Sequence, residues 1–272
     1  MKVPPFQAIC PGAFAVAGSS DIGCVRKENQ DAWLVDESLG LVVVADGMGG
    51  GPAGAQAAQA VAGRLPELLR KGLNGRNASP RRPRTAQRSD PAGMRCREAR
   101  RLLRETVLAL SREILRASED DPERKGMGAT VVAAWRCGTV VHVVHQGDSR
   151  AYLFRGGVLN KLTADHSIVA LLMRNGEITE KEATKHPARG QLTRFVGMPG
   201  DVYCEVQTLK IEDGDRLLLC TDGLWGIVND DEIAAVLASH AELERGCGEL
   251  IELAKRRGAP DNVTALVWNV GL

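Results

Sequence analysis

Hydrophobic residues along this chain follow two kinds of pattern. Short, nearly continuous apolar runs are typical of buried strands, and they predict strands at residues 14–19, 32–36, 40–46, 129–137, 139–147, 150–155, 158–163, 203–209, 215–220 and 262–270. Stretches with apolar residues at helical spacing predict helices at residues 52–71, 97–118, 230–239 and 241–256, and residues 167–187 are expected to be mainly helical.

The predicted strands and helices come in clusters, and many neighbouring strands are joined by short turns. Gly156-Gly157 separates two short strands and is typical of a hairpin turn. This order favours antiparallel sheets flanked by helices, an α+β layered domain, over the alternating strands and helices of a parallel sheet.

Residues 72–97 interrupt the pattern. They have no apolar period and are rich in Gly, Pro and Arg, so we expect a flexible basic insertion within the domain. Three roles remain open for it: a solvated loop, a docking arm for an acidic partner, or a nucleic-acid contact. The last is least favoured, because the 272-residue chain has a net charge of only +1, and general nucleic-acid binding requires a strong positive field.

The composition is ordinary for a globular protein, with 44% apolar and 25% charged residues. Seven cysteines, an odd number without a C-x-x-C pair, favour reduced thiols over a disulfide framework or a zinc site. No apolar run reaches the roughly 18–20 residues of a membrane span, and the first ten residues lack the apolar core of a signal peptide. These features predict a cytoplasmic protein.

Four aspartates stand next to predicted strands. Asp46, Asp148 and Asp222 follow apolar runs, and Asp261 precedes one. Carboxylates that converge at strand ends repel one another, and a bound divalent cation relieves that repulsion. Carboxylate oxygens, a backbone carbonyl and water are the ligands that Mg²⁺ and Mn²⁺ prefer. The pattern therefore predicts a metal centre that acts on phosphate.

The glycine-rich stretch after Asp46 allows other interpretations. Asp46 alone would be an ordinary turn residue that caps the next helix, but similar segments at Asp222 and Asp261 favour metal ligands. Residues 49–54 also satisfy G-x-G-x-x-G, yet no second strand ending in an acidic residue follows, which disfavours a dinucleotide site. A P-loop is excluded, because no G-K-[S/T] follows the glycines.

Several longer segments carry a more specific resemblance. They are IGCVRKENQDAW, LVVVADGMGGGPAG, GMGATVVAA, VHQGDSRAYLFRGG, LTADHSIVALLMRNGEIT, HPARGQLTRFVG, GDRLLLCTDGLWGIV and APDNVTALV. In these segments and their order, the chain resembles the bacterial metal-dependent protein phosphatases of the PP2C family. The resemblance implies a four-layer αββα sandwich with two mostly antiparallel sheets. It implies one domain over residues 13–272, preceded by a tail at residues 1–12.

The resemblance also implies roles for individual residues. Asp46 would bridge two metal ions, with the carbonyl of Gly47 as a further ligand. Asp222 and Asp261 would complete the pair of ions. Asp148 resembles the residue that helps to hold a third, weaker metal ion.

Other positions would act around the metals. Arg26 resembles the arginine that binds the substrate phosphate, a role that suits the guanidinium fork. Asp31 would hold metal-bound water, and Asn262 would steady the turn that carries Asp261. Two positions depart from the animal members: Met48 replaces a proposed general acid, so water would protonate the leaving oxygen, and Gln30 replaces a water-holding glutamate.

The segment 164–198 resembles the family's flap, a mobile cover beside the metal site that would tune substrate choice and the third metal. His166 lies in this segment, but a helix-start residue beside Ser167 is favoured over a catalytic acid. His142 and His145 lie in a predicted strand, and we expect them to be structural.

The function implied by the resemblance is Mn²⁺- or Mg²⁺-dependent hydrolysis of phosphoserine and phosphothreonine in proteins. A hydroxide bridging two metal ions would attack phosphorus directly, without a phosphoenzyme. We expect a monomer that opposes a bacterial Ser/Thr kinase, with phosphoproteins as partners and neither nucleic acid nor membrane. The alternative is a non-catalytic phosphoprotein-binding module of the same fold, which would be expected to lack a metal ligand.

Overall fold

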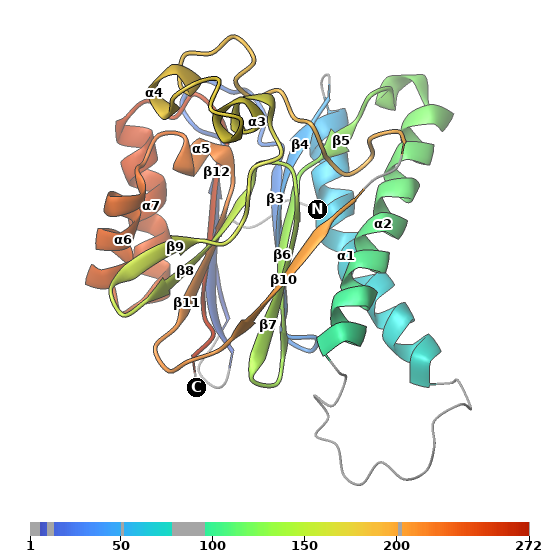
Figure 1. The fold of residues 1–272 in the computed structure, drawn as a ribbon, viewed down its shortest axis with the longest axis horizontal. Coiled ribbons are helices and arrows are strands. Elements are labelled where there is room, and N and C mark those ends of the chain that lie inside the picture. Colours follow the sequence, from blue (N-terminus) through green and yellow to red (C-terminus); the bar gives the residue numbers. More distant parts are fainter. Residues whose placement is uncertain (1–5, 10–13, 50–51, 78–95, 201–202, 272) are drawn as a thin grey trace, which may run out of the picture.

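Two β-sheets pack face to face in the computed structural model, which describes residues 6–9, 14–49, 52–77, 96–200 and 203–271 (Figure 1). The first sheet has the strand order β1-β2-β12-β11-β8-β9. The second sheet has the order β10-β7-β6-β4-β3, and β5 pairs with β4. All of these pairings are antiparallel.

The strands of the first sheet are β1 (Phe6–Ile9), β2 (Ala15–Asp21), β8 (Arg150–Arg155), β9 (Val158–Lys161), β11 (Arg216–Cys220) and β12 (Val263–Asn269). Those of the second sheet are β3 (Asp31–Asp36), β4 (Leu41–Met48), β5 (Gly128–Ala129), β6 (Val131–Cys137), β7 (Val140–Gln146) and β10 (Glu205–Lys210). Each predicted strand corresponds to one of these, and the Gly156-Gly157 turn joins β8 to β9.

Helices cover the outer face of each sheet. The helices are α1 (Ala53–Asn77), α2 (Cys96–Asp120), the 3-10 helix η1 (Pro122–Arg124), α3 (Ile168–Arg174), α4 (Glu180–Ala183), α5 (Asp222–Trp225), α6 (Asp230–Ser239) and α7 (Leu243–Arg256). Helices α1 and α2 lie on the second sheet, and α6 and α7 lie on the first (Figure 1). The predicted αββα sandwich is confirmed.

Strand β4 shows why its apolar run is continuous rather than alternating. Val42 and Val44 point into the core between the two sheets. Leu41, Val43 and Ala45 point the other way, into the core under α1 and α2. Since both faces of the strand are buried, every position from residue 41 to 45 is apolar.

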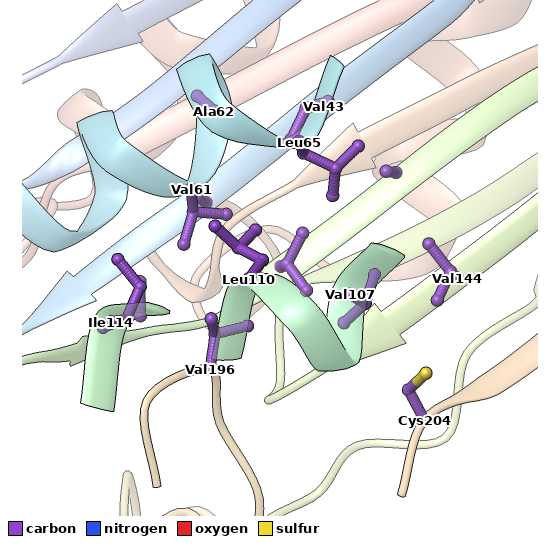
Figure 2. Packing of buried hydrophobic residues seen from close by; sticks show 14 of the residues in the cluster. Val43, Val61, Ala62, Leu65, Val107, Leu110, Ile114, Val144, Val196 and Cys204 are labelled. Atoms are coloured by element: carbon purple, nitrogen blue, oxygen red, sulfur yellow. The ribbon is translucent and has the colours of Figure 1, made fainter. Parts of the chain in front are cut away.

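The core beneath α1 and α2 is drawn in Figure 2. Val61 and Leu65 of α1 meet Val107 and Leu110 of α2 above the second sheet, and all four are fully buried. Complete burial of such a side chain contributes about 1.5–3 kcal/mol to stability. This packing anchors β4, which carries Asp46, against the helices.

Helix ends differ from the sequence-based expectation around the basic insertion. The insertion was predicted at 72–97, but α1 continues to Asn77 and α2 begins at Cys96. Leu73 still packs against the core although its neighbours are polar, so the helix continues beyond the point where the apolar period ends. The arginine-rich interior, residues 78–95, lies outside the described residues.

Three further segments depart from the prediction. Residues 6–9, expected in a tail, form β1 and pair with β2. Residues 167–187 hold only two short helices, because Gly176 adopts a positive φ of 75° after α3 and Thr179 then caps α4. Helix α5 was not predicted, since four residues are too few to show a period. Among the described residues, no helix is long and apolar enough to cross a bilayer.

Candidate metal centre

The predicted site aspartates gather at one end of the sandwich, where strands from both sheets end. Asp31 and Asp46 lie opposite each other in register on β3 and β4 of the second sheet. Asp222 is the first residue of α5, directly after β11, and Asp261 comes just before β12; both strands belong to the first sheet. Helix α5 lies at this end of the two sheets in Figure 1.

Asp31 links the two sheets. Its Oδ2 accepts hydrogen bonds from the hydroxyl groups of Thr221, at 2.9 Å, and Thr264, at 2.6 Å. Its Oδ1 is buried and has no hydrogen-bond partner among the described residues. Burial raises the pKa of Asp31 to about 7 in spite of the two hydroxyl donors, because an ionised carboxylate is poorly solvated there. Asp31 therefore has one oxygen held in place and one still able to accept a hydrogen bond.

The backbone of Asp46 is fixed by Thr130 of the segment between β5 and β6. The Asp46 N–H donates to Thr130 Oγ1 at 2.9 Å, and the Thr130 N–H donates to the Asp46 carbonyl at 2.8 Å. Burial raises the pKa of the Asp46 carboxyl well above its usual range, and further rises come from the nearby negative charges of Asp31, Asp222, Asp148 and Asp261. The structure thus brings the other four predicted carboxylates within electrostatic reach of Asp46.

Asp148 and Asp222 show the same surplus of negative charge. Burial raises the pKa of Asp148 to about 8, and the charges of Asp222 and Asp165 add to the rise. Burial raises the pKa of Asp222 to about 6, and the charge of Asp261 adds to it. Asp222 Oδ1 is also buried without a hydrogen-bond partner in the described part of the chain.

Arg26 contacts Asp261 directly. Its Nη2 lies 2.6 Å from Asp261 Oδ2, and the two side chains are 55% and 34% exposed. The hydrogen bond and the charge of Asp261 raise the pKa of Arg26. A residue expected to bind phosphate is thus paired with a residue expected to bind metal. An exposed pair of this kind contributes little to stability, so Arg26 is free to exchange partners.

Gly47 lies where backbone segments come close together. A Cβ atom at this position would lie 2.0 Å from the carbonyl oxygen of Gly54 and 2.8 Å from that of Gln30. The Gly47 N–H donates to the Gln30 carbonyl at 3.0 Å. Any side chain would push α1 away from the end of β4.

Asn262 joins the Asp261 turn to the loop that carries Arg26. Its Oδ1 accepts the Gln30 N–H at 2.8 Å, and its Nδ2 donates to the carbonyls of Ile22 and Glu28, each at 2.9 Å. These bonds fix two segments more than 230 positions apart in the sequence, at 232, 240 and 234 residues.

The three histidines considered from the sequence have packed environments. His166 and His145 stack with ring centroids 4.6 Å apart, and His166 Nδ1 accepts the Gly147 N–H at 3.2 Å. Burial lowers the pKa of His166 to about 4, and the His145 ring adds to this. His142 contacts the Thr208 hydroxyl at 2.8 Å. Because burial lowers its pKa, His166 is disfavoured as a proton-donating imidazolium.

Several residues of the site were missed in the sequence. Arg189, in the predicted flap, lies near enough to Asp222 to lower its pKa, and its Nη2 is 3.4 Å from the Gly226 carbonyl. Thr221 and Thr264 were missed as partners of Asp31. Thr221 directly precedes Asp222, but a hydroxyl next to a turn aspartate gives no sign of a partner on another sheet.

The donor set fits a divalent metal ion. Among the described residues, Asp31 and Asp222 each offer a buried carboxylate oxygen without a hydrogen-bond partner. Burial, and then repulsion from neighbouring carboxylates, raises the pKa of Asp46. A hard cation stabilises such groups in their ionised form. Within the described ranges, no three Asp, Glu, His or Cys side chains are grouped closely enough to hold a metal ion as they stand, and the Asp261 carboxylate is paired with Arg26.

Known proteins are similar to this chain in both sequence and fold. A family model described as protein phosphatase 2C matches residues 25–255. The serine/threonine phosphatase stp of Listeria monocytogenes is 33% identical over 251 residues, covering 91% of this chain and 92% of that protein.

Solved structures agree with the family match. The Mycobacterium tuberculosis serine/threonine phosphatase PstP/Ppp has a TM-score of 0.77 and 33% identity, covering 95% of this chain and 99% of that one. The catalytic domain of PstP in complex with two manganese ions has a TM-score of 0.74 and 32% identity, with the same coverage of 95% and 99%. The chain, with its cluster of buried carboxylates, therefore belongs to the protein phosphatase 2C family.

Proposed function

We propose that this protein is a metal-dependent phosphatase that hydrolyses phosphoserine and phosphothreonine in proteins. One observation carries the proposal: four buried or half-buried carboxylates, those of Asp31, Asp46, Asp148 and Asp222, lie together with raised pKa values. Such an arrangement is unfavourable unless positive charge is bound. The serine/threonine phosphatases that share its sequence, and a relative with two manganese ions, support this activity.

Five groups would hold the metal ions. Asp46, the Gly47 carbonyl, Asp222 and Asp261 would bind two ions, and Asp148 would help to bind a weaker third. When bound, the ions would lower the pKa of water, polarise the phosphoryl oxygens and orient the substrate. Mg²⁺ has the same preference for oxygen ligands as Mn²⁺, so we propose that either ion serves.

The chain's own residues would bind the phosphate and orient the attacking water. Arg26 is more than half exposed and is paired with Asp261, so its guanidinium could turn to the oxygens of an incoming phosphate and bind them bidentately. The Oδ1 of Asp31, which is buried without a hydrogen-bond partner among the described residues, could accept a hydrogen bond from an attacking water. Met48 cannot donate a proton, so solvent water would protonate the leaving serine or threonine oxygen.

The surroundings of the site suggest how substrates are chosen. Residues 164–198, with the short helices α3 and α4, lie beside α5 at the same end of the molecule (Figure 1). Arg189 of this segment brings a second guanidinium near Asp222. We propose that the segment acts as the flap over the site and that the phosphatase works as a monomer opposing a Ser/Thr kinase.

Replacement of one ligand tests the proposed function. Asp222→Asn keeps the shape of the side chain and removes its charge. We expect Mn²⁺-dependent hydrolysis of a phosphothreonine peptide to fall by about 100-fold or more, because loss of a group that only orients a metal ligand already costs about 10–100-fold. Excess chelator should abolish turnover by the parent protein. Asp213→Asn, at an exposed turn before β11, is the matched control and should keep full activity. Unchanged turnover in Asp222→Asn would refute the assigned role, and phosphopeptide binding without turnover by the parent would favour the non-catalytic alternative.

A further inference from the structure

Arg150 holds together three parts of the site through one guanidinium group. Its Nε and Nη2 bind Asp165 Oδ1 and Oδ2 at 3.0 and 2.6 Å, and its Nη1 donates to the Tyr152 hydroxyl at 2.9 Å. Its Cζ lies 3.4 Å from the centre of the Trp225 ring. The side chains of Arg150 and Asp165 are only 14% and 6% exposed, so this contact is shielded from solvent.

Trp225 connects Arg150 to the proposed metal ligands. Its indole Nε1 donates to the main-chain carbonyl of Asp148 at 3.0 Å. Trp225 is also the last residue of α5, and Asp222 is the first. The indole therefore connects the backbone of one proposed ligand with the short helix that carries another.

Asp165, the carboxylate partner of Arg150, belongs to the proposed flap. Asp165 stands at the beginning of residues 164–198, just before His166, whose backbone N–H donates to the Gly147 carbonyl at 2.9 Å. Gly147 directly precedes Asp148. The start of the flap, α5 and the Asp148 turn are thus joined around a single arginine.

A bidentate arginine–carboxylate pair also occurs elsewhere in this fold without such connections. Arg155, at the opposite end of β8, binds Asp215 with Nε–Oδ1 at 2.7 Å and Nη2–Oδ2 at 2.6 Å. Asp215 is almost fully buried, and the other hydrogen bonds of Arg155 in the described part of the chain go to Glu212 and to the Lys210 carbonyl, away from the site aspartates. The Arg155–Asp215 pair therefore has the same geometry as the Arg150–Asp165 pair but lies away from the site.

We propose that Arg150 is a positioning residue: stacked on Trp225 and paired with Asp165, it holds the Asp148 turn in the arrangement that binds the weaker metal ion. This inference rests on the proposed function for the assignment of Asp148. The guanidinium is planar and forms a fixed fork, so lysine cannot reproduce the pair and the stack together. Arg150 itself touches neither substrate nor metal in this account.

The test compares Arg150→Lys with the matched control Arg155→Lys. Mn²⁺ binding is measured by isothermal titration calorimetry, and phosphopeptide turnover is measured as a function of Mn²⁺ concentration. For Arg150→Lys we expect the Kd of the weakest Mn²⁺ binding event to rise by about 10-fold or more, as for other groups that orient metal ligands. The Mn²⁺ concentration for half-maximal turnover should rise by a similar factor. Tighter Mn²⁺ binding should change by a smaller factor than the weak binding, because Asp46 and Asp261, which would also hold the two tighter ions, lie outside these contacts.

Arg155→Lys should lose a similar ion pair without altering either Mn²⁺ measurement. Trp225→Phe keeps an aromatic face for Arg150 but removes the N–H that holds Asp148, so it should shift weak Mn²⁺ binding in the same direction. The double variant Arg150→Lys/Trp225→Phe should shift it by less than the product of the single effects, because both act through one contact. Trp225→Phe also keeps the proposal testable if Arg150→Lys fails to fold.

Three results would overturn the proposal: unchanged weak Mn²⁺ binding in both Arg150→Lys and Trp225→Phe, an equal shift in Arg155→Lys, or fully multiplicative effects in the double variant. Calorimetry keeps these results separate from the proposed function. A parent protein that binds Mn²⁺ but hydrolyses no phosphopeptide would refute the function, while the binding series would still decide the role of Arg150. A parent protein that binds no Mn²⁺ would contradict both.

Discussion

Asp31 receives its hydrogen bonds from Thr221 and Thr264, which are 190 and 233 positions away in the sequence. The sequence pointed to four other aspartates because each stands beside an apolar run, and to Asp31 through the family resemblance. It could not point to the two threonines, because the pairing depends on how one sheet packs on the other. The same limit applies to Arg150 and Trp225, whose contact requires β8 and α5 to meet. The role of a residue could thus be predicted where its neighbours in the sequence indicate it, and not where it depends on contacts between distant segments.

Arg26→Ala tests the exchange of partners at the residue scale. Removing the guanidinium takes away a charge-assisted contact to phosphate, and the KM for a phosphothreonine peptide should rise by about 10-fold or more. Mn²⁺ binding measured by calorimetry should be unchanged or tighter, because Asp261 is released from its ion pair. Arg64→Ala, which removes an exposed arginine paired with Glu113 on the helical face, is the control. A loss of Mn²⁺ binding in Arg26→Ala would show that the arginine has a structural role instead.

Strands were easier to predict than helix ends at the scale of elements. β4 and β11 are buried on both faces, so their apolar runs are continuous. Helix α1 continues through polar residues beyond residue 71 because Leu73 still contacts the core, and a pattern without periodicity gave no sign of this. Helix α5 is short, yet it positions both Asp222 and Trp225. Short elements at the site were therefore the least predictable ones.

Leu110→Ala tests the packing that anchors the second sheet to its helices. Leu110 is fully buried on the inner face of α2 (Figure 2). Its truncation leaves a cavity, so the free energy of unfolding should fall by about 2–5 kcal/mol. Leu108→Ala is the matched control, because Leu108 lies on the same helix and packs on the same core but is only partly buried. Urea denaturation measures both. An equal loss in the two variants would contradict the packing described here.

The four-layer architecture explains the site at the scale of the whole molecule. Two antiparallel sheets end together, and carboxylates from both converge where the ends meet. The αββα layers could be predicted from the resemblance and, as an α+β layered fold, from the pattern alone. The Arg26–Asp261 pair could not, because it is a contact between two residues that were each assigned a different partner.

The surplus of negative charge predicts how pH affects the metal-free protein. The folded-state pKa values of Asp222, Asp31 and Asp148, about 6, 7 and 8, all exceed the unfolded value of about 3.9. The folded protein therefore binds more protons than the unfolded chain between roughly pH 4 and pH 8, and its stability falls as pH rises through this window.

Urea denaturation with excess chelator at a series of pH values measures this effect. We expect the free energy of unfolding to be lower at pH 8 than at pH 5 by about 1.4 kcal/mol or more, the equivalent of at least one pKa unit. Added Mn²⁺ should stabilise the protein more at pH 8 than at pH 5, because metal and protons compete for the same carboxylates. Stability that rises with pH in the chelated protein would contradict the described clustering.

The most direct test of the central claim is an anomalous X-ray difference map from crystals grown with Mn²⁺. The account predicts two strong peaks in contact with the carboxylates of Asp46, Asp222 and Asp261, with Arg26 no longer paired to Asp261. Peaks located only elsewhere, or no peaks beside these three aspartates while Arg26 keeps its ion pair, would contradict it.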